Sequence, residues 1–416
     1  MQRQNRKTAL GLAAWLLWIP AAIGMPQSAV DADLRAGLLA LDRNDLVHAC
    51  ESLERAVKQD PRSAVGWVAL AQSYLRSGRR DGAMAAARNA EQFGADTPAI
   101  EHALALFYAG TGDPARAAGW ERRFAASPGA GADGAASAAA LSLDAGRPEI
   151  AIQWARTALE RQDSPRQHNL LGKAYQAAGQ LDNAIGELRL AAKAAPRQEA
   201  FVYDLGQALL LSEDFEQALA VLDEGRRQFP ENPSIAVAFG VACYGRRRFE
   251  DAVTAFLDAV RLDGSIEQPY VFLGRILDHA GDRLPRVIRA FARWEKRDPD
   301  NYLPVFLHAK ALAASSGPPS PEIEPELLRS IQLNDSFWES HLELGVLLAQ
   351  RADWQAAARR LSRSIELNPR SIRAHYQLAL VYQRQGNPEF ARKERAEYER
   401  LNEAANGTGE RGDAAR

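Results

Sequence analysis

Residues 171–196 read LGKAYQAAGQLDNAIGELRLAAKAAP, and this stretch decides the fold. Its apolar residues recur at steps of three and four on both sides of Gly179, which is the pattern of two amphipathic helices. Gly179 stands where the first helix would end, and Pro196 stands where the second would end, as helix-terminating residues do. The stretch therefore predicts a helix, a tight turn and a second helix packed against the first.

The same pattern returns along most of the chain. Alanines equivalent to Ala184 recur at steps of 33 or 34 residues, at Ala49, Ala83, Ala117, Ala151, Ala184, Ala218 and Ala252, and the series resumes at Ala357 and Ala391. Twelve or thirteen residues before these alanines, an apolar residue precedes a small one, as at Leu171 and Gly172. Small side chains suit places where two helix backbones approach closely. A repeat of this length predicts a stack of helix pairs.

This pattern resembles that of the tetratricopeptide repeat family, which is built of 34-residue helix–turn–helix units. One unit matches the family pattern position by position, at Leu171, Gly172, Tyr175, Gly179, Ala184, Leu188, Ala191 and Pro196. The resemblance implies an all-α fold, a right-handed α-solenoid of about eleven TPR-like repeats over residues 30–402.

Two stretches depart from the regular repeat, and the end of the chain departs from it altogether. Residues 128–140 are rich in Gly and Ala, and residues 301–335 contain SSGPPSP in place of a tight turn. Because proline and glycine interrupt helices, we expect irregular repeats at both places. The Gly-rich, charged residues 403–416 are expected to form a disordered tail.

Residues 1–24 have the three-part pattern of an export signal. Basic residues within 3–7 precede an apolar run over 9–19, and small residues follow at Ala22 and Gly24. The run is shorter than the roughly 20 residues that a membrane span needs. We therefore expect a cleaved signal peptide and a periplasmic or secreted protein. An uncleaved segment would instead anchor the chain in the bacterial inner membrane, facing the periplasm.

Composition excludes several classes of protein. The chain has 416 residues, of which 46% are hydrophobic, and its formal net charge is −2. This balance argues against global disorder and against a dedicated nucleic-acid-binding protein. The two cysteines are too few for a disulfide framework or a cysteine-rich zinc module. No two of the seven histidines have the i, i+3 or i, i+4 spacing of a helical metal site, so neither a metal nor a cofactor is expected.

No residue pattern indicates catalysis. The sequence holds no Walker A, HExxH or GxSxG motif, and the GxGxxG matches that begin at Gly129 and Gly407 do not follow a strand within a βαβ unit, as dinucleotide binding requires. The repeats fill nearly all of the chain and leave no room for a catalytic domain. We therefore expect a protein that is not an enzyme.

The resemblance implies that the first helix of each repeat lines a concave groove that binds a protein or peptide. In repeats five to nine the exposed groove positions would be Asn169, Lys173, Tyr203, Gln207, Tyr244, Phe272, Arg275, Tyr302 and Phe306. Aromatic and long polar side chains are typical of protein-binding surfaces. The same aromatic rings would also suit packing between repeats, and the sequence leaves both interpretations open.

The expected function is a non-enzymatic protein–protein interaction scaffold of the bacterial envelope, with a peptide or protein partner bound in the groove. The alternative is an accessory, regulatory or assembly subunit of an envelope enzyme or secretion complex. Neither function calls for nucleic acid, metal or cofactor. The membrane would be involved only through an uncleaved N-terminal segment.

Overall fold

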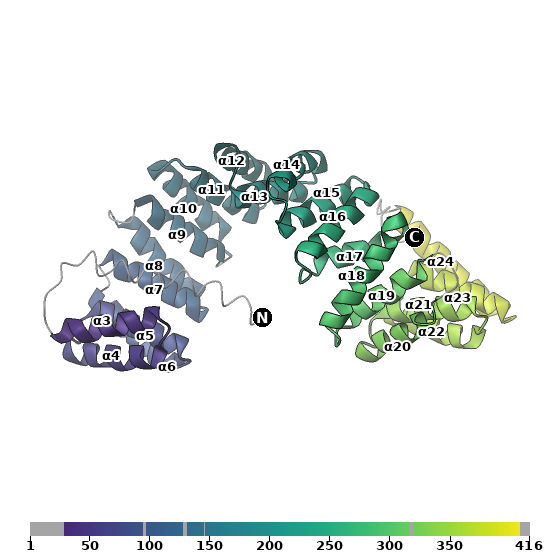
Figure 1. The fold of residues 1–416 in the computed structure, drawn as a ribbon, viewed down its shortest axis with the longest axis horizontal. Helices are drawn as coiled ribbons and strands as arrows, with labels where there is room; N and C mark the ends of the chain where they lie inside the picture. Colours follow the sequence, from purple (N-terminus) through teal and green to yellow (C-terminus); the bar gives the residue numbers. More distant parts are fainter. Residues whose placement is uncertain (1–28, 95–96, 128–130, 145, 316–319, 408–416) are drawn as a thin grey trace. The chain divides into compact units, whose positions relative to one another are not determined.

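The computed structural model describes residues 29–94, 97–127, 131–144, 146–315 and 320–407. Within these ranges it contains 22 α-helices, two short 3-10 helices and no strand (Figure 1). The predicted signal segment 1–24 lies outside the described residues. The chain divides into two compact units, residues 1–212 and residues 213–416.

The first unit holds the first eleven helices. They are α3 (Ala29–Asp42), α4 (Leu46–Gln59), α5 (Ala64–Arg76), α6 (Arg80–Gly94), α7 (Pro98–Thr111), α8 (Pro114–Ala126), α9 (Gly131–Asp144), α10 (Pro148–Arg161), α11 (Pro165–Ala177), α12 (Leu181–Ala194) and α13 (Glu199–Leu211).

The second unit holds the remaining helices. They are α14 (Phe215–Gln228), α15 (Pro233–Gly245), α16 (Phe249–Leu262), α17 (Gln268–Arg275), η1 (Leu277–His279), η2 (Gly281–Arg283), α18 (Leu284–Arg297), α19 (Tyr302–Ala313), α20 (Ile323–Leu333), α21 (Trp338–Gln350), α22 (Trp354–Leu367), α23 (Ile372–Arg384) and α24 (Pro388–Gly407).

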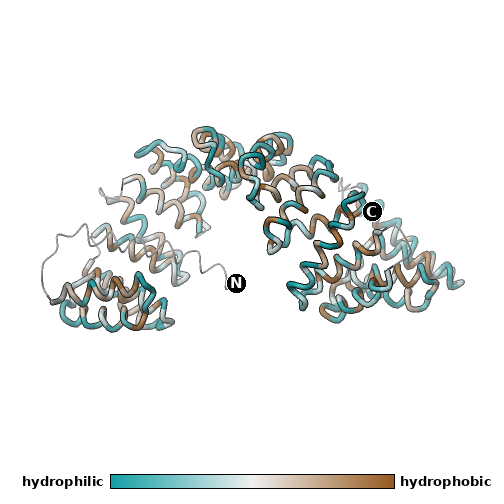
Figure 2. Tube along the Cα trace, viewed as in Figure 1, coloured by the Kyte–Doolittle hydropathy of each residue, from teal (hydrophilic) through white to brown (hydrophobic). Residues whose placement is uncertain are grey.

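Taken in chain order, the described α-helices form eleven successive helix–turn–helix segments, as the repeat predicts. Within each unit the two helices of a pair contact each other, and the second helix also packs against the first helix of the next pair. Hydrophobic and hydrophilic residues alternate along the helices (Figure 2), because each amphipathic helix buries one stripe and exposes the other. The all-α, helix-pair fold predicted from the sequence is confirmed.

The core consists largely of the small residues that repeat along the sequence. Every alanine of the series that includes Ala184 is buried, with at most 8% of its surface exposed. Gly172 shows why this position needs a small residue: a Cβ atom there would lie 2.5 Å from Cγ of Leu188. Two helices of a pair can approach this closely only because the position carries no side chain.

The turns inside the pairs share one backbone feature. Five residues before each alanine of the series stands a residue with φ between 57° and 80°, in the left-handed region: Asn44, Gly78, Gly112, Gly146, Gly179, Glu213, Arg247, Ala352 and Gly386. In the turn after α7, Gly112 takes this conformation, Asp113 accepts a hydrogen bond from the Arg116 N–H, and Pro114 opens α8. Gly112 thus ends α7, and the N-cap Asp113 followed by Pro114 starts α8.

The eighth repeat departs from the regular pair in its first helix. Helix α17 is only eight residues long and is followed by η1 and η2 before α18 begins. Val287 takes the place of the usual alanine and is fully buried. The chain therefore absorbs one extra residue between these helices without losing the buried contact.

Three boundaries differ from the sequence-based expectation or cannot be compared with it. Residues 131–140 lie in α9 and residues 128–130 lie outside the described part, so the expectation of an irregular repeat over 128–140 stays a prediction. Helix α24 continues to Gly407, so the expectation that the tail starts at residue 403 is wrong for residues 403–407. Residues 408–416 are not described. None of the described helices is both long enough and apolar enough to cross a membrane.

Candidate functional site: a cationic pocket between α20 and α22

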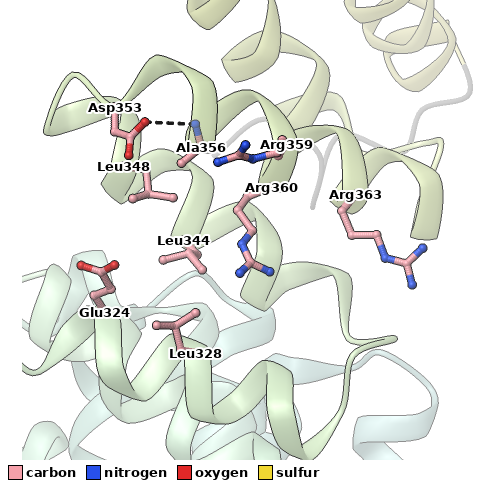
Figure 3. Close-up of a pocket in the computed structure, with 9 residues that line it drawn as sticks. All are labelled: Glu324, Leu328, Leu344, Leu348, Asp353, Ala356, Arg359, Arg360 and Arg363. Carbon is pink, nitrogen blue, oxygen red and sulfur yellow. Dashed lines mark hydrogen bonds between the residues drawn. The ribbon is translucent and has the colours of Figure 1, made fainter.

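A pocket of about 440 Å³ lies in the second unit, between α20, α21 and α22 (Figure 3). Helix α20 supplies two of the lining residues, α21 supplies two, and the turn before α22 and its first turns supply the rest. They are Glu324, Leu328, Leu344, Leu348, Asp353, Ala356, Arg359, Arg360 and Arg363.

The apolar part of the pocket comes from leucines on two helices. Leu344 and Leu348 lie one turn apart on α21 and therefore on one face of that helix. Leu344 is 1% exposed, whereas Leu348 and Leu328 are half-buried. The half-buried leucines leave apolar surface that a ligand could cover, and covering such surface is favourable by about 25 cal/mol per Å².

Helix α22 begins at the edge of the pocket because its N-terminus is capped there. The Ala356 N–H donates to the Asp353 carboxylate at 3.1 Å (Figure 3), and Ala352 before it takes the left-handed turn conformation. An acidic N-cap stabilises the first turn of a helix. The cap fixes where α22 starts and hence where its arginines stand.

Two of the three pocket arginines have no ionic partner among the described residues. Arg363 donates to Asp335 at 2.8 Å and to Glu366 at 3.2 Å, and its hydrogen bond holds the pKa of the Asp335 carboxyl below the ordinary range. Arg359 and Arg360 make no hydrogen bond or ion pair with any residue that the structure describes. Figure 3 shows Arg360 extending from α22 into the space beside Leu344.

The acidic residues that line the pocket form no ion pair with Arg359 or Arg360. Glu324 forms an ion pair with Arg351, outside the pocket lining, and Asp353 is engaged by the helix cap. The pocket therefore combines half-buried apolar surface with two guanidinium groups that are free to donate. A guanidinium binds a carboxylate through paired hydrogen bonds, so the arrangement suits a segment with acidic and apolar side chains.

The predicted groove residues of the first unit lie on α11 and α13. Asn169 is 9% exposed, and its Nδ2 donates to the Asp204 carboxylate at 2.9 Å. Gln207 donates to the hydroxyl of Tyr203 at 2.9 Å, and Lys173 is exposed. Asn169 thus joins the first helices of two consecutive repeats, while Lys173 keeps its side chain on the surface.

The predicted groove residues on α15 and α17 contact one another. The rings of Tyr244 and Phe272 meet edge to face with centroids 5.1 Å apart, and Phe272 also stacks on Phe256 at 5.0 Å. The exposed Arg275 places its guanidinium carbon 5.9 Å from the centre of the Phe272 ring. Tyr244 and Phe272 therefore pack between repeats seven and eight, and ligand binding by these rings stays a prediction.

The last two predicted groove residues pack on a residue that the sequence did not single out. The rings of Tyr302 and Phe306 lie 4.8 Å and 5.0 Å from the ring of Phe337, which precedes α21. Phe306 is only 5% exposed. None of the nine predicted groove positions lines the pocket between α20 and α22.

Sequence reasoning missed this pocket because its arginines lie on the second helix of a repeat. The resemblance directs attention to the first helices. The signal that could have found them is the density of positive charge over residues 359–363, where three of five residues are arginine. Their lack of carboxylate partners, however, depends on the packing of α20 and α22 and is not visible in the sequence.

Comparison with known proteins supports the repeat assignment. A family model described as tetratricopeptide repeat matches residues 34–99 and residues 203–265. A search of curated proteins finds no match.

Several solved structures are similar to the chain at low sequence identity. A tetratricopeptide repeat protein from Parabacteroides merdae has a TM-score of 0.45 and 16% identity, over 59% of this chain and 97% of its own. PilW, a type IV pilus biogenesis factor, has a TM-score of 0.41 and 18% identity, over 50% of this chain and 98% of its own. Yeast Tom70 has a TM-score of 0.38 and 13% identity, over 89% of this chain and 92% of its own.

Proposed function

We propose that this chain, which carries tetratricopeptide repeats, is a non-enzymatic scaffold that binds a protein partner through the pocket between α20 and α22. The observation that carries the proposal is the pair of unpartnered guanidiniums, Arg359 and Arg360, beside the half-buried Leu328 and Leu348. Tandem helical repeats support it, because they present extended surfaces suited to protein binding. The partner would offer a segment in which acidic and apolar side chains alternate.

Anion binding and apolar burial have separate roles in this proposal. Charge pairing at Arg359 and Arg360 would set the orientation of the segment and speed its association. Burial of apolar side chains against Leu328 and Leu348 would supply much of the affinity. Because exposed charges are screened within about 10 Å at 0.1 M salt, binding should weaken as the salt concentration rises.

The test uses two fluorescent peptides of equal length, one carrying Asp and Leu and the other carrying Lys in place of Asp. We expect the acidic peptide to bind in fluorescence anisotropy and the basic one to bind at least tenfold more weakly. The double variant Arg359→Glu/Arg360→Glu should weaken binding of the acidic peptide roughly tenfold or more, since each decade is about 1.4 kcal/mol.

A matched control changes the same charge elsewhere in the second unit. Arg286 and Arg289 on α18 are exposed and do not line the pocket, so Arg286→Glu/Arg289→Glu should change the affinity by less than about threefold. An equal loss in both double variants would show that binding follows overall charge. Failure of the wild-type chain to bind the acidic peptide would contradict the proposed site.

We further propose that the chain acts in the bacterial envelope. The support is the basic, apolar and small-residue pattern of residues 1–24, which is typical of export signals. Fractionation of cells expressing the full chain should recover it in the periplasm or medium, with an N-terminus at Met25. Recovery of the full-length chain with the inner membrane would favour the anchor, and recovery in the cytosol would contradict export.

A further inference from the structure

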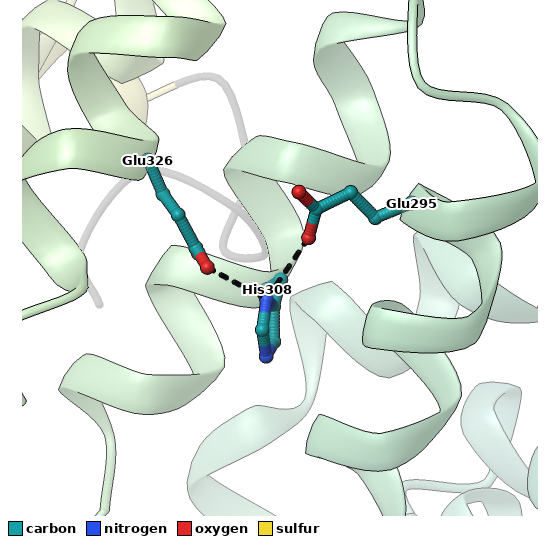
Figure 4. Close-up of side chains that lie close together, drawn as sticks. All are labelled: Glu295, His308 and Glu326. Carbon is teal, nitrogen blue, oxygen red and sulfur yellow. Dashed lines mark hydrogen bonds and ion pairs between the residues drawn. The ribbon is translucent and has the colours of Figure 1, made fainter.

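Three metal-binding side chains from three consecutive helices meet in the second unit. Glu295 comes from α18, His308 from α19 and Glu326 from α20, and one donor atom of each lies within 4.8 Å of the other two. Nδ1 of His308 is 3.1 Å from a carboxylate oxygen of Glu295 and 2.9 Å from one of Glu326 (Figure 4). Among the described residues, this is the one such group of three.

The position of His308 in the repeat explains how there is room for the group. His308 stands 34 residues after Gly274 and directly follows Leu307, so it takes the place that a small residue takes in other repeats. A glycine or alanine there lets the two helices of a pair approach closely. In this repeat the tight turn is replaced by a longer connection before α20, and imidazole and carboxylate groups fill the space between the helices.

One imidazole cannot fully satisfy both carboxylates, although Glu295 also accepts a hydrogen bond from Arg329. Both of them face the same nitrogen of His308, and one N–H proton serves one strong hydrogen bond at a time. The second oxygen of Glu326, Oε2, is buried and has no hydrogen-bond partner among the residues that the structure describes. A buried carboxylate oxygen without a donor is costly, and a cation at the centre of the group would satisfy both carboxylates together.

Arg329 orients the Glu295 carboxylate but is not itself a proposed ligand. Its Nη1 donates to Oε1 of Glu295 at 2.5 Å, and its Nη2 donates to the carbonyl of Pro299 at 2.8 Å. The arginine therefore turns the other Glu295 oxygen, Oε2, toward His308. Outer hydrogen bonds of this kind commonly orient the ligands of a metal ion.

We propose that Glu295, His308 and Glu326 form a binding site for a divalent transition-metal ion of the Zn²⁺ class. Zinc is bound by His nitrogen and by carboxylate oxygen at about 2.0–2.2 Å, commonly with three protein ligands and one open position. Tetrahedral bonds of that length separate ligand atoms by roughly 3.4 Å, so the observed separations of 2.9 Å and 3.1 Å need to grow by only a few tenths of an ångström. The imidazole favours such a metal over Mg²⁺ or Ca²⁺.

This metal site is separate from the proposed scaffold function, and a bound ion would hold neighbouring helices of the scaffold together. The ion would join α18, α19 and α20, where the longer connection leaves the ninth repeat without a tight turn. Proton and metal compete for Nδ1, because only the neutral imidazole can bind a metal. Glu295 and Glu326 are the carboxylates that contact this imidazole, and Arg329 pairs with Glu295. Binding should therefore weaken on acidification.

The test is calorimetric titration of the metal-free, tag-free full chain with Zn²⁺ at pH 7.5. We expect one ion per chain and a rise in the thermal unfolding midpoint when Zn²⁺ is saturating. His308→Gln should abolish this binding, and Glu326→Gln should weaken it at least tenfold. His375→Gln is the matched control, because His375 is also buried and contacts Glu394 at 2.6 Å but faces no second carboxylate on that nitrogen.

Far-UV circular dichroism keeps folding separate from binding. If His308→Gln is not fully helical, Glu295→Gln replaces it. Metal binding is then measured from the visible absorption of Co²⁺ added to the wild type and to the variant. Folded wild-type chain that binds no Zn²⁺ or Co²⁺ would overturn the proposal. Equal affinity in the wild type and in folded His308→Gln, or an equal loss in His375→Gln, would place the ion elsewhere and would also overturn it.

Discussion

His341 and His375 occupy the same position in two successive repeats, yet their surroundings differ in charge. In each, Nε2 lies 3.1 Å from the backbone carbonyl of the residue six positions earlier. Nineteen residues after His375 stands Glu394, which contacts its Nδ1 at 2.6 Å, whereas Arg360 stands nineteen residues after His341. Nδ1 of His341 is buried and has no hydrogen-bond partner in the described part of the chain. The exchange of glutamate for arginine at this position of the repeat therefore decides whether Nδ1 of the histidine has a carboxylate partner.

The two histidines should give opposite dependences of stability on pH. Burial lowers the pKa of His341. At His375 burial also lowers the pKa, but the hydrogen bond with Glu394 and the other favourable contacts outweigh burial and raise it. The raised pKa of His375 stabilises the fold at pH values below the unfolded-state pKa of about 6.5, and this stability is lost as the pH rises through the folded-state pKa. The lowered pKa of His341 stabilises the fold above about pH 6.5, and this stability is lost on acidification.

Urea unfolding at pH 5.5 and pH 8 checks this expectation. His375→Gln should cost about 1.5–3 kcal/mol at pH 5.5, the usual contribution of a hydrogen bond to a charged group, and clearly less at pH 8. His341→Gln should cost less at pH 5.5 than at pH 8. The same sign of pH dependence in both variants would show that the Glu394 contact does not control the titration of His375.

At the scale of a helix pair, α11 and α12 contain two glycines with opposite surroundings. A Cβ at Gly172 would lie 2.5 Å from Cγ of Leu188 and 3.2 Å from the Ala184 carbonyl, whereas a Cβ at Gly186 would meet nothing within 4 Å. The first glycine is required by the close approach of the two helices. The second merely lowers the helix propensity of α12.

The matched substitutions should therefore change stability in opposite directions. We expect Gly172→Ala to lower the free energy of unfolding by about 1–3 kcal/mol, as forced overpacking does. Gly186→Ala should raise it by up to about 1 kcal/mol, because alanine favours a helix over glycine. Chemical denaturation of both variants provides the measurement, and a neutral Gly172→Ala would mean that Leu188 moves aside without cost.

The helix pairs were predictable from the sequence because their determinants are local and repeated. The apolar period, the alanine series and the Gly-Asp-Pro turn at residues 112–114 each depend on residues close together in the chain. The left-handed conformation of Ala352 could not be predicted from the residue type, because alanine does not favour it. Its place in the repeat imposes it.

The candidate sites were less predictable because they depend on contacts between distant helices. Arg359 and Arg360 matter because they line the pocket but form no hydrogen bond or ion pair with any described residue. The group around His308 draws its ligands from residues 13 and 18 positions away in the sequence, so a search for ligands along one helix could not find it. For the same reason, Phe337 could not be foreseen as the packing partner of Phe306.

At the scale of the whole molecule, the buried apolar surface is unevenly distributed among the repeats. The buried residues of α9 are small, and four of them are alanines between residues 135 and 139. Helix α15 buries Ile235, Val237 and Phe239 along with smaller residues. Since stabilisation follows apolar area removed from water, and a repeat protein gains stability from each repeat and its neighbours, the two helices should open at different free energies.

Hydrogen exchange on the intact chain, read by mass spectrometry, should detect this difference. We expect backbone amides of α9 to exchange at least tenfold faster than those of α15, a difference of about 1.4 kcal/mol in opening free energy. Peptides from α11 and α16 serve as references within each unit. Equal protection of α9 and α15 would show that stability is spread evenly by coupling between repeats.

The left-handed turn residues also bear on how such a chain can lengthen or shorten over evolutionary time. From Asn44 to Arg247 they return every 33 or 34 residues with nearly the same backbone angle, whatever the side chain. A duplication or deletion whose ends fall at two such turns joins matching conformations and adds or removes one whole helix pair. Recombination at these points therefore changes the number of modules without requiring a new junction.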